Sequence, residues 1–126
     1  MSAPAPAAVP PGTRLYAVGD VHGEALALTC LMERIREDAE DAKALRRVLV
    51  LLGDYVDRGP DSRRVIDLLL NDPAPGFETR FIRGNHDAWL LAFLDNPSSG
   101  FEWLNAGGQA TLLSYGASAP PGPRTP

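Results

Sequence analysis

The chain has 126 residues, of which 44% are hydrophobic and 22% charged, a composition typical of one globular domain. Its formal net charge of −4 argues against a general nucleic-acid-binding surface. No segment reaches the roughly 18 apolar residues that a membrane span needs, and the single cysteine, Cys30, excludes an intrachain disulfide. We expect a cytoplasmic protein, with Cys30 as a small residue of the core.

Proline-rich segments stand at both ends of the sequence. Residues 1–13 are rich in proline and alanine and lack a basic region before an apolar one, so they predict a disordered leader and not a signal peptide. Residues 117–126 have a similar composition and predict a disordered tail. The ordered domain is therefore expected to cover residues 14–116.

Between these segments, short apolar runs alternate with amphipathic ones. Residues 14–18 predict a strand, and an apolar stripe at helical spacing follows it: Leu28, Leu31, Met32 and Ile35. Residues 47–52 read RVLVLL, an apolar run after Arg47, as in a strand buried on both faces. Asp61 or Ser62 can cap the next helix.

The pattern then repeats. Residues 79–83 predict a third strand, residues 86–96 predict a helix whose apolar stripe lies in the core (Trp89, Leu90, Phe93 and Leu94), and residues 111–115 predict a last short helix. This alternation predicts an α/β fold with a parallel β-α-β-α-β sheet and flanking helices.

Polar clusters follow each of the three predicted strands. They read GDVHG at residues 19–23, GDYVDRG at 53–59 and RGNHD at 83–87. Ligands of parallel sheets bind beyond the carboxyl ends of the strands, so the three clusters are expected to form one site.

The first two clusters have the composition of a metal site. Asp20 and His22 are two residues apart on extended chain and can bind one ion from the same side. Carboxylate and imidazole ligands favour manganese, with iron, zinc or nickel as alternatives. Two such ions, about 3.5–4 Å apart, can hold a phosphoryl group and generate hydroxide at neutral pH. Asp54 is the natural carboxylate to bridge them.

The remaining polar residues suit phosphate chemistry. Arg58 and Arg83 offer planar donors for phosphate oxygens. His86, which follows Asn85, is a candidate general acid, and Asp57 can orient its ring. Each of these residues alone is more typical of a helix cap, a turn or the surface. Three clusters at three consecutive strand ends favour the metal site.

Taken together, the three motifs resemble the metallophosphoesterase signature of bacterial phosphoprotein phosphatases. Residues 103–116 are also similar to the segment that follows in those proteins. The resemblance implies a four-layer αββα fold with two sheets, and hydrolysis by a hydroxide that two metal ions activate. It implies substrates such as phosphoserine or phosphothreonine proteins, dinucleoside polyphosphates or other small phosphoesters.

The resemblance also implies a role for each motif residue. Asp20 and His22 would be ligands of the first metal, Asp54 the bridge, and Asn85 a ligand of the second metal. The other roles are His86 as the acid, Asp57 as its partner, and Arg58 and Arg83 as phosphate contacts.

The chain departs from that family in its supply of metal ligands. Family members add two further histidines, another arginine and a second sheet, whereas His22 and His86 are the only histidines here. The second metal is left with Asp54 and Asn85, so the chain looks like the amino-terminal half of a phosphatase. We therefore expect weak or no activity from this chain alone. Without the second sheet, the face of strand 47–52 that it would cover should favour self-association.

Two other functions stay open at this point. The chain can be a non-catalytic remnant that binds metal or phosphate and acts through a partner. Alternatively, it is a folded scaffold that retains the motifs without using them.

Overall fold

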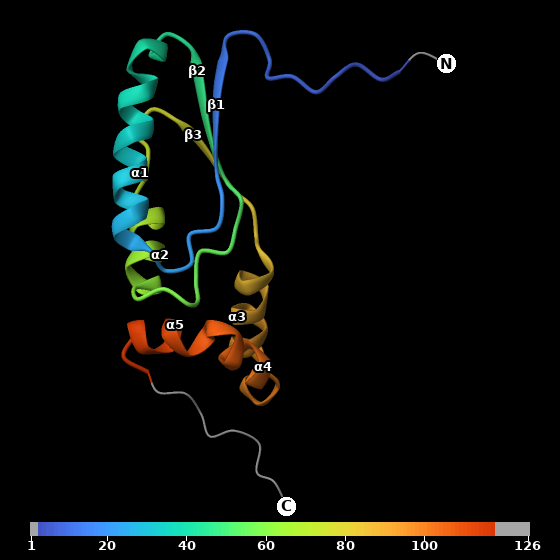
Figure 1. The fold of residues 1–126 in the computed structure, drawn as a ribbon, viewed down its shortest axis with the longest axis vertical. Coiled ribbons are helices and arrows are strands. Elements are labelled where there is room, and N and C mark those ends of the chain that lie inside the picture. The colour runs from blue at the N-terminus through green and yellow to red at the C-terminus, as the bar shows by residue number, and fades with distance from the viewer. Residues whose placement is uncertain (1–2, 118–126) are drawn as a thin grey trace, which may run out of the picture.

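A computed structural model describes residues 3–117 and contains a three-stranded parallel sheet. The strands are β1 (Thr13–Val18), β2 (Arg46–Leu51) and β3 (Glu78–Phe81), in the order β1-β2-β3 (Figure 1). Val18 pairs with Leu51, and Leu51 with Phe81, so the three strands end side by side. The alternation of apolar runs and helical stripes thus gives the parallel α/β sheet that the sequence predicts.

Helices α1 (Ala25–Asp38) and α2 (Ser62–Leu70) cover one face of this sheet (Figure 1). Helix α1 buries residues at helical spacing, Ala25, Leu28, Met32 and Ile35, and continues into the short 3₁₀ helix η1 (Ala39–Ala42). The prediction that Cys30 lies in the core is wrong, because its side chain is exposed. The buried stripe runs through Ala25 and Met32, which turns Cys30 toward solvent.

Helix α2 begins where the sequence predicts a cap. The side chain of Asp61 accepts a hydrogen bond from the backbone N–H of Arg64 (3.2 Å), which satisfies one of the free donors of the first turn. Val65 and Leu69 face inward and join Leu49 and Leu51 of β2 in the main core. The core thus lies between the two helices and this face of the sheet.

The C-terminal helices lie beyond the carboxyl ends of the strands (Figure 1). They are α3 (Asn85–Asp95), the 3₁₀ turn η2 (Pro97–Ser99), α4 (Phe101–Trp103), the π turn η3 (Leu104–Gly108) and α5 (Gln109–Ser114). Phe93, Trp103 and Leu104 form a second, smaller core. Trp89 and Leu94 are 43% and 63% exposed, so the predicted core stripe of α3 is buried only in part.

The other face of the sheet is open. Strand alternation places Leu15, Leu52 and Ile82 on it, and these side chains are 43%, 46% and 48% exposed. Val48 lies on the same face as its partner Leu15 and is 7% exposed, so the prediction that residues 47–52 form a strand buried on both faces holds at Val48 as well as at Leu49 and Leu51, and fails at Leu52.

The predicted element boundaries differ slightly from the observed ones. Strand β1 begins at Thr13, β2 begins and ends one residue earlier than predicted, and β3 ends at Phe81. The described residues form one sheet, so the second sheet that the resemblance implies is not among them. The predicted tail lies, apart from Ala117, outside the described residues. Within residues 3–117, no helix has the length and apolar character to cross a membrane.

Candidate metal and phosphate site

Backbone hydrogen bonds join the loops that follow β1 and β2. The carbonyl of Asp54 accepts from the N–H groups of Val21 (3.0 Å) and His22 (2.9 Å), and Gly23 N–H donates to the carbonyl of Tyr55 (3.0 Å). Gly59 packs so closely against His22 that a Cβ atom there would overlap the carbonyl of His22. Gly23 and Gly59 therefore allow a backbone approach between these two loops that larger residues would block.

Asp87 joins the third loop to the second. Its carboxylate accepts from the backbone N–H groups of Asp54 (2.7 Å), Tyr55 (3.0 Å) and Gly84 (2.9 Å). Sequence reasoning assigned no role to Asp87. Its position in the first turn of α3, where acidic residues accept from the N-terminal backbone, is the signal that could have found it.

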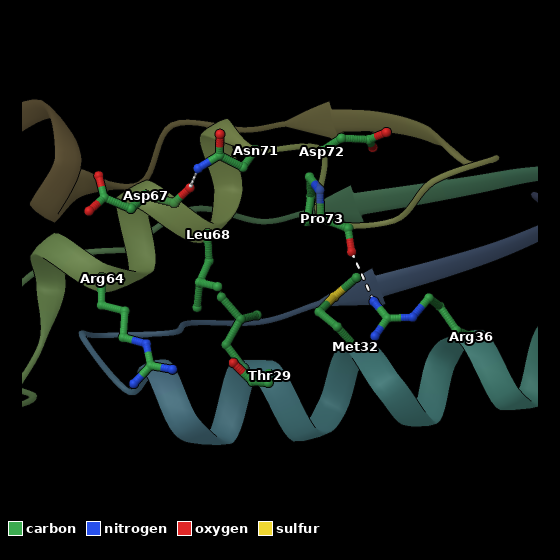
Figure 2. A pocket seen from close by; sticks show the side chains of 10 residues that line it. Thr29, Met32, Arg36, Arg64, Asp67, Leu68, Asn71, Asp72 and Pro73 are labelled. Atoms are coloured by element: carbon green, nitrogen blue, oxygen red, sulfur yellow. Dashed lines mark hydrogen bonds between the residues drawn. The ribbon is translucent and has the colours of Figure 1, made fainter.

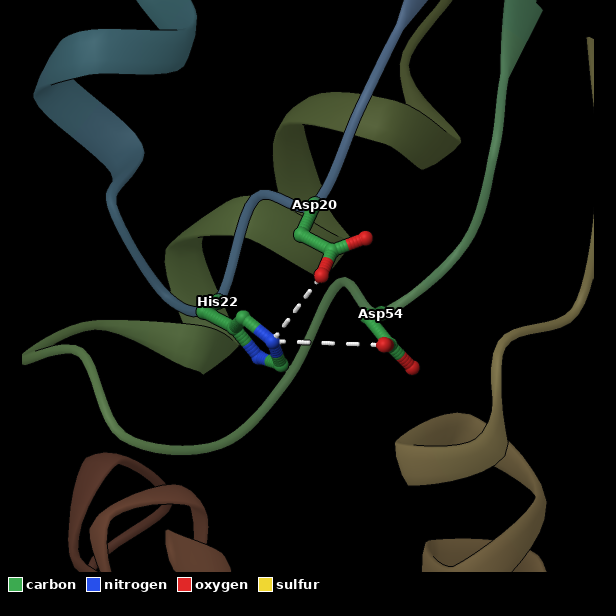
Figure 3. Close-up of side chains that lie close together, drawn as sticks. All are labelled: Asp20, His22 and Asp54. Atoms are coloured by element: carbon green, nitrogen blue, oxygen red, sulfur yellow. Dashed lines mark ion pairs between the residues drawn. The ribbon is translucent and has the colours of Figure 1, made fainter.

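The predicted ligands of the first metal come together at the ends of β1 and β2. One potential ligand atom from each of Asp20, His22 and Asp54 lies within 4.8 Å of the others (Figure 3). His22 Nε2 is 3.5 Å from Asp20 Oδ2 and 3.9 Å from Asp54 Oδ2. His22 Nδ1 donates to the carbonyl of Val56 (2.8 Å), which leaves the Nε2 lone pair directed at the carboxylates. This donor set fits a hard or borderline divalent cation.

Asn85 lies against the carboxylate of Asp54. One atom of its side-chain amide is 3.1 Å from Asp54 Oδ2 and 3.2 Å from Oδ1, and as the nitrogen it donates to both oxygens. Rotation of the amide by 180° puts its oxygen in the same position. That second orientation is the one a cation shared by Asp54 and Asn85 requires, so the pair also fits a metal.

Strained backbone is concentrated in this site. Five non-glycine residues of the described chain have positive φ angles, and four of them are candidate site residues: His22 (44°), Asp54 (56°), Asp57 (79°) and Arg58 (72°). Such conformations are unfavourable for residues with a side chain and persist where surrounding contacts fix them. Their concentration at the strand ends supports a functional role for these loops.

His86 and Asp57 form a buried pair next to the metal ligands. Their side chains are 5% and 0% exposed, and His86 Nδ1 donates to Asp57 Oδ2 (2.8 Å). The backbone N–H of His86 donates to Asp54 Oδ1 (2.9 Å), so the pair is attached to the predicted bridging carboxylate. Asp57 also accepts from Trp103 and Thr111, two contacts that sequence reasoning did not anticipate.

The two predicted phosphate contacts differ in their surroundings. Arg58 is exposed, with Nη2 3.5 Å from His86 Nε2 and its backbone N–H donating to the carbonyl of Gly107 (3.1 Å). The guanidinium thus lies at the mouth of the site. Arg83 is exposed directly before Gly84, and within residues 3–117 its side chain makes no hydrogen bond or ion pair.

A separate pocket lies between α1 and α2, away from the strand ends. Figure 2 shows Thr29 and Met32 of α1 facing Leu68 of α2, with Arg36 donating to the carbonyl of Pro73 (3.2 Å). This pocket contains no cluster of metal ligands. In the described part of the chain, Asp20, His22 and Asp54 are the single group of three potential ligands.

Comparison with known proteins agrees with this geometry. The model of the family described as calcineurin-like phosphoesterase matches residues 13–120. The chain belongs to this family. Calcineurin-like phosphoesterases are hydrolases and use divalent metals, so the convergence of Asp20, His22 and Asp54 is the candidate metal centre of a member of this family.

Curated relatives of this calcineurin-like phosphoesterase include proteins of two kinds. It is 40% identical over 78 residues to the symmetrical bis(5'-nucleosyl)-tetraphosphatase of Delftia acidovorans, covering 62% of this chain and 25% of the relative. It is 38% identical over 81 residues to the tetraphosphatase of the same name from Stutzerimonas stutzeri, covering 64% and 26%. It is 33% identical over 100 residues to serine/threonine-protein phosphatase 1 of Salmonella typhimurium, covering 79% and 42%. The matches therefore span less than half the length of these relatives.

Proposed function

We propose that this chain carries the metal-binding and acid-base residues of a phosphoester hydrolase that uses two divalent ions, of which manganese suits the donor set best. The observation that carries the proposal is the joint position of Asp20, His22, Asp54 and Asn85 beside the buried pair of His86 and Asp57. Metal ligands next to an oriented imidazole can catalyse phosphoester hydrolysis, because metal ions stabilise the phosphoryl group and the imidazole can protonate the leaving group.

Each residue has a distinct part in this proposal. Asp20, His22 and Asp54 would hold one ion, and Asp54 and Asn85 would contribute to a second. Divalent ions at this site would supply Lewis acidity toward phosphoryl oxygens and make a nucleophile from water at neutral pH. Arg58 would orient the phosphate through its planar donors, with Arg83 as a second contact.

His86 would complete the reaction as a general acid. Asp57 accepts from Nδ1 of the ring (2.8 Å), which leaves Nε2 on the side of Arg58 (3.5 Å). A proton on Nε2 can then pass to the oxygen of the leaving group, so that the alcohol leaves neutral.

The two kinds of relative suggest two classes of substrate. The Delftia and Stutzerimonas proteins are named as dinucleoside tetraphosphatases, and the Salmonella protein as a serine/threonine phosphatase. We propose that the substrate belongs to one of these two classes: a dinucleoside tetraphosphate cleaved at a phosphoanhydride bond, or a phosphomonoester of serine or threonine. Comparing hydrolysis of bis(5'-adenosyl) tetraphosphate and of a phosphothreonine peptide distinguishes them.

One observation favours a second, binding-only function. The second ion has Asp54 and Asn85 as its ligands in this chain, which has two histidines in all. Without a complete ligand set, this ion would bind weakly and the phosphoryl group would be held from one side. The alternative is a non-catalytic protein that binds one metal ion or a phosphate and acts through a partner.

Metal titration and turnover together test these functions. We expect calorimetry to show about one Mn²⁺ bound per chain with useful affinity, and slow or no hydrolysis of 4-nitrophenyl phosphate. Slow hydrolysis that requires Mn²⁺ supports the enzyme, whereas binding without hydrolysis supports the binding protein. No binding of Mn²⁺ would contradict the enzyme and the metal-binding form of the alternative.

A further inference from the structure

The carboxylate of Asp57 is held by three side-chain donors, one each from α3, α4 and α5. Its Oδ2 atom accepts from His86 Nδ1 (2.8 Å) and from the indole Nε1 of Trp103 (2.6 Å). Its Oδ1 atom accepts from the hydroxyl of Thr111 (2.7 Å). Trp103 and Thr111 lie 46 and 54 residues beyond Asp57 in the sequence, so these contacts are formed only in the folded chain.

The hydroxyl of Thr111 contacts Asp57 twice. It donates to the carboxylate and accepts from the backbone N–H of the same residue (2.8 Å). That N–H also donates to Ser62 Oγ (3.1 Å). Since the backbone of Asp57 has a positive φ of 79°, these contacts act on a residue whose conformation needs external support.

A kinked helical segment brings both donors to the same carboxylate. Trp103 and Thr111 lie on either side of the π turn Leu104–Gly108, in which Gly107 has a φ of 119°. The carbonyl of Gly107 accepts from the backbone N–H of Arg58 (3.1 Å), so the turn itself contacts the loop that carries Asp57.

Because Asp57 is buried, its carboxylate needs these protein donors. Asp57, Trp103 and Thr111 are 0%, 3% and 2% exposed, so the carboxylate depends on protein donors and not on solvent. The indole N–H can only donate, and the hydroxyl has one proton to give. With both of its oxygens engaged, the carboxylate presents Oδ2 to His86 in one orientation.

We propose that Trp103 and Thr111 are positioning residues that fix the orientation of the His86 ring through Asp57. The proposal rests on the proposed function for the catalytic use of His86. The orientation of the ring, however, can be measured without turnover. If either donor is lost, the carboxylate gains rotational freedom and the ring of His86 loses its fixed partner.

A simple packing role makes a different prediction. The ring centroids of Trp103 and Phe93 are 4.9 Å apart, and both residues belong to the second core. If Thr111 only fills space, Thr111→Val, which keeps its shape, is tolerated better than Thr111→Ser, which loses a methyl group. If Thr111 positions Asp57, the order is reversed.

Nuclear magnetic resonance of the two histidine rings tests the proposal on the chain itself. Long-range ¹H–¹⁵N correlations report which ring nitrogen carries the proton. In the unaltered chain and in Thr111→Ser, we expect a protected proton on His86 Nδ1. In Thr111→Val, we expect its exchange with solvent to be at least about tenfold faster, because the hydrogen bond to a charged acceptor is weakened. The backbone amide of Leu49, which is fully buried in the main core, is the internal reference, and its exchange should not change.

Trp103→Phe is the second test, and it decides the question where Thr111→Val does not fold. It removes the N–H and keeps an aromatic ring, whereas Phe93→Leu disturbs the same core without removing a donor to Asp57. We expect faster exchange at His86 in Trp103→Phe and not in Phe93→Leu. Unchanged His86 signals in both Thr111→Val and Trp103→Phe would overturn the proposal.

Turnover separates this proposal from the proposed function. Where hydrolysis is measurable, Thr111→Val and Trp103→Phe should lower kcat about 10- to 100-fold for alkyl phosphates and less for 4-nitrophenyl phosphate, with little change in KM. If the ring signals change as expected but no phosphoester is hydrolysed, the positioning role stands and the enzymatic function fails. Equal loss of kcat on both substrates would contradict positioning of an acid.

Discussion

Asp54 makes more of the contacts that define the site than any other candidate ligand. Its carboxylate lies 3.9 Å from His22 Nε2, contacts the amide of Asn85 and accepts from the backbone N–H of His86. Its backbone carbonyl accepts from Val21 and His22. A charge change at this residue should therefore affect both proposed ions, whereas a change at Asp20 should affect one.

We predict that Asp54→Asn weakens Mn²⁺ binding more than Asp20→Asn does. Loss of a residue that only supports a metal ligand typically costs 10- to 100-fold in affinity, so loss of the ligand itself should cost more than about 100-fold. Calorimetric titration of the two variants and the unaltered chain measures this. An Asp54→Asn chain that binds Mn²⁺ as the unaltered chain does would show that the metal assignment is wrong.

His86 is the residue whose role depends most on the substrate. As a general acid, it should contribute about 10²- to 10⁴-fold for leaving groups that need a proton and little for those that do not. We predict that His86→Asn lowers hydrolysis of alkyl phosphates strongly and of 4-nitrophenyl phosphate slightly. The measurement uses this chain, or a longer protein that contains it, with Mn²⁺. An equal loss on both substrates would assign His86 a structural role.

At the scale of elements, Asp87 ties the beginning of α3 to the loop after β2. It accepts three backbone hydrogen bonds, from Asp54, Tyr55 and Gly84. We predict that Asp87→Ala lowers the free energy of unfolding by roughly 1–3 kcal/mol, because three partly buried backbone donors lose their acceptor. Asp95→Ala, at the exposed end of the same helix, is the control and should change it little. Urea denaturation of both variants measures the difference, and equal stability would contradict this role for Asp87.

The ion pair between β2 and β3 gives a pH dependence of known sign. Arg46 donates twice to Glu78, at 2.7 Å each, and this hydrogen bonding lowers the pKa of Glu78 from its ordinary value of about 4.5. Because the pKa of Glu78 is lower in the folded chain than in the unfolded chain, the ion pair stabilises the fold fully at pH values above the pKa of Glu78 in the unfolded chain. This stabilisation is lost as the pH falls through the folded pKa.

We predict that the free energy of unfolding of Glu78→Gln falls less steeply than that of the unaltered chain as the pH drops below about 4.5. At pH 7 the two free energies should differ little, since the pair is exposed. Urea denaturation from pH 3 to 7 measures this. Glu102→Gln, an exposed acid outside the sheet, is the matched control. If the free energy of unfolding of both variants depends on pH as that of the unaltered chain does, the ion pair does not contribute to stability.

The sequence predicts those features of the fold and site that depend on residues close together in the chain, and not those that depend on contacts between distant residues. Strands, helices and the Asp61 cap follow from periodicity within a few residues, and the three clusters follow from the geometry of parallel sheets. The contacts of Asp87 with Tyr55 and of Trp103 with Asp57 join residues 32 and 46 positions apart, and no local pattern encodes them. The exposure of Cys30 depends on which side of α1 packs against the sheet, and that is decided by tertiary packing.

At the scale of the whole molecule, the layers are asymmetric. Helices α1 and α2 cover one face of the sheet, and the opposite face leaves Leu15, Leu52 and Ile82 between 43% and 48% exposed (Figure 1). Apolar side chains that gather on one face of a protein commonly mark an interface. Within residues 3–117, the outer strands β1 and β3 also each have one unpaired edge, which adds to this tendency.

We predict that the isolated chain associates with itself through this open face as its concentration rises. Burial of the exposed apolar side chains supplies the driving force, so charge on the face should oppose it. Sedimentation velocity at increasing concentration should show dimers or larger species for the unaltered chain, and a shift toward monomer for the double variant Leu15→Lys, Ile82→Lys. Leu70→Lys is the control, because Leu70 is 77% exposed on α2, away from the open face. A chain that stays monomeric throughout, or a control that shifts as far as the double variant, would show that the open face does not drive association.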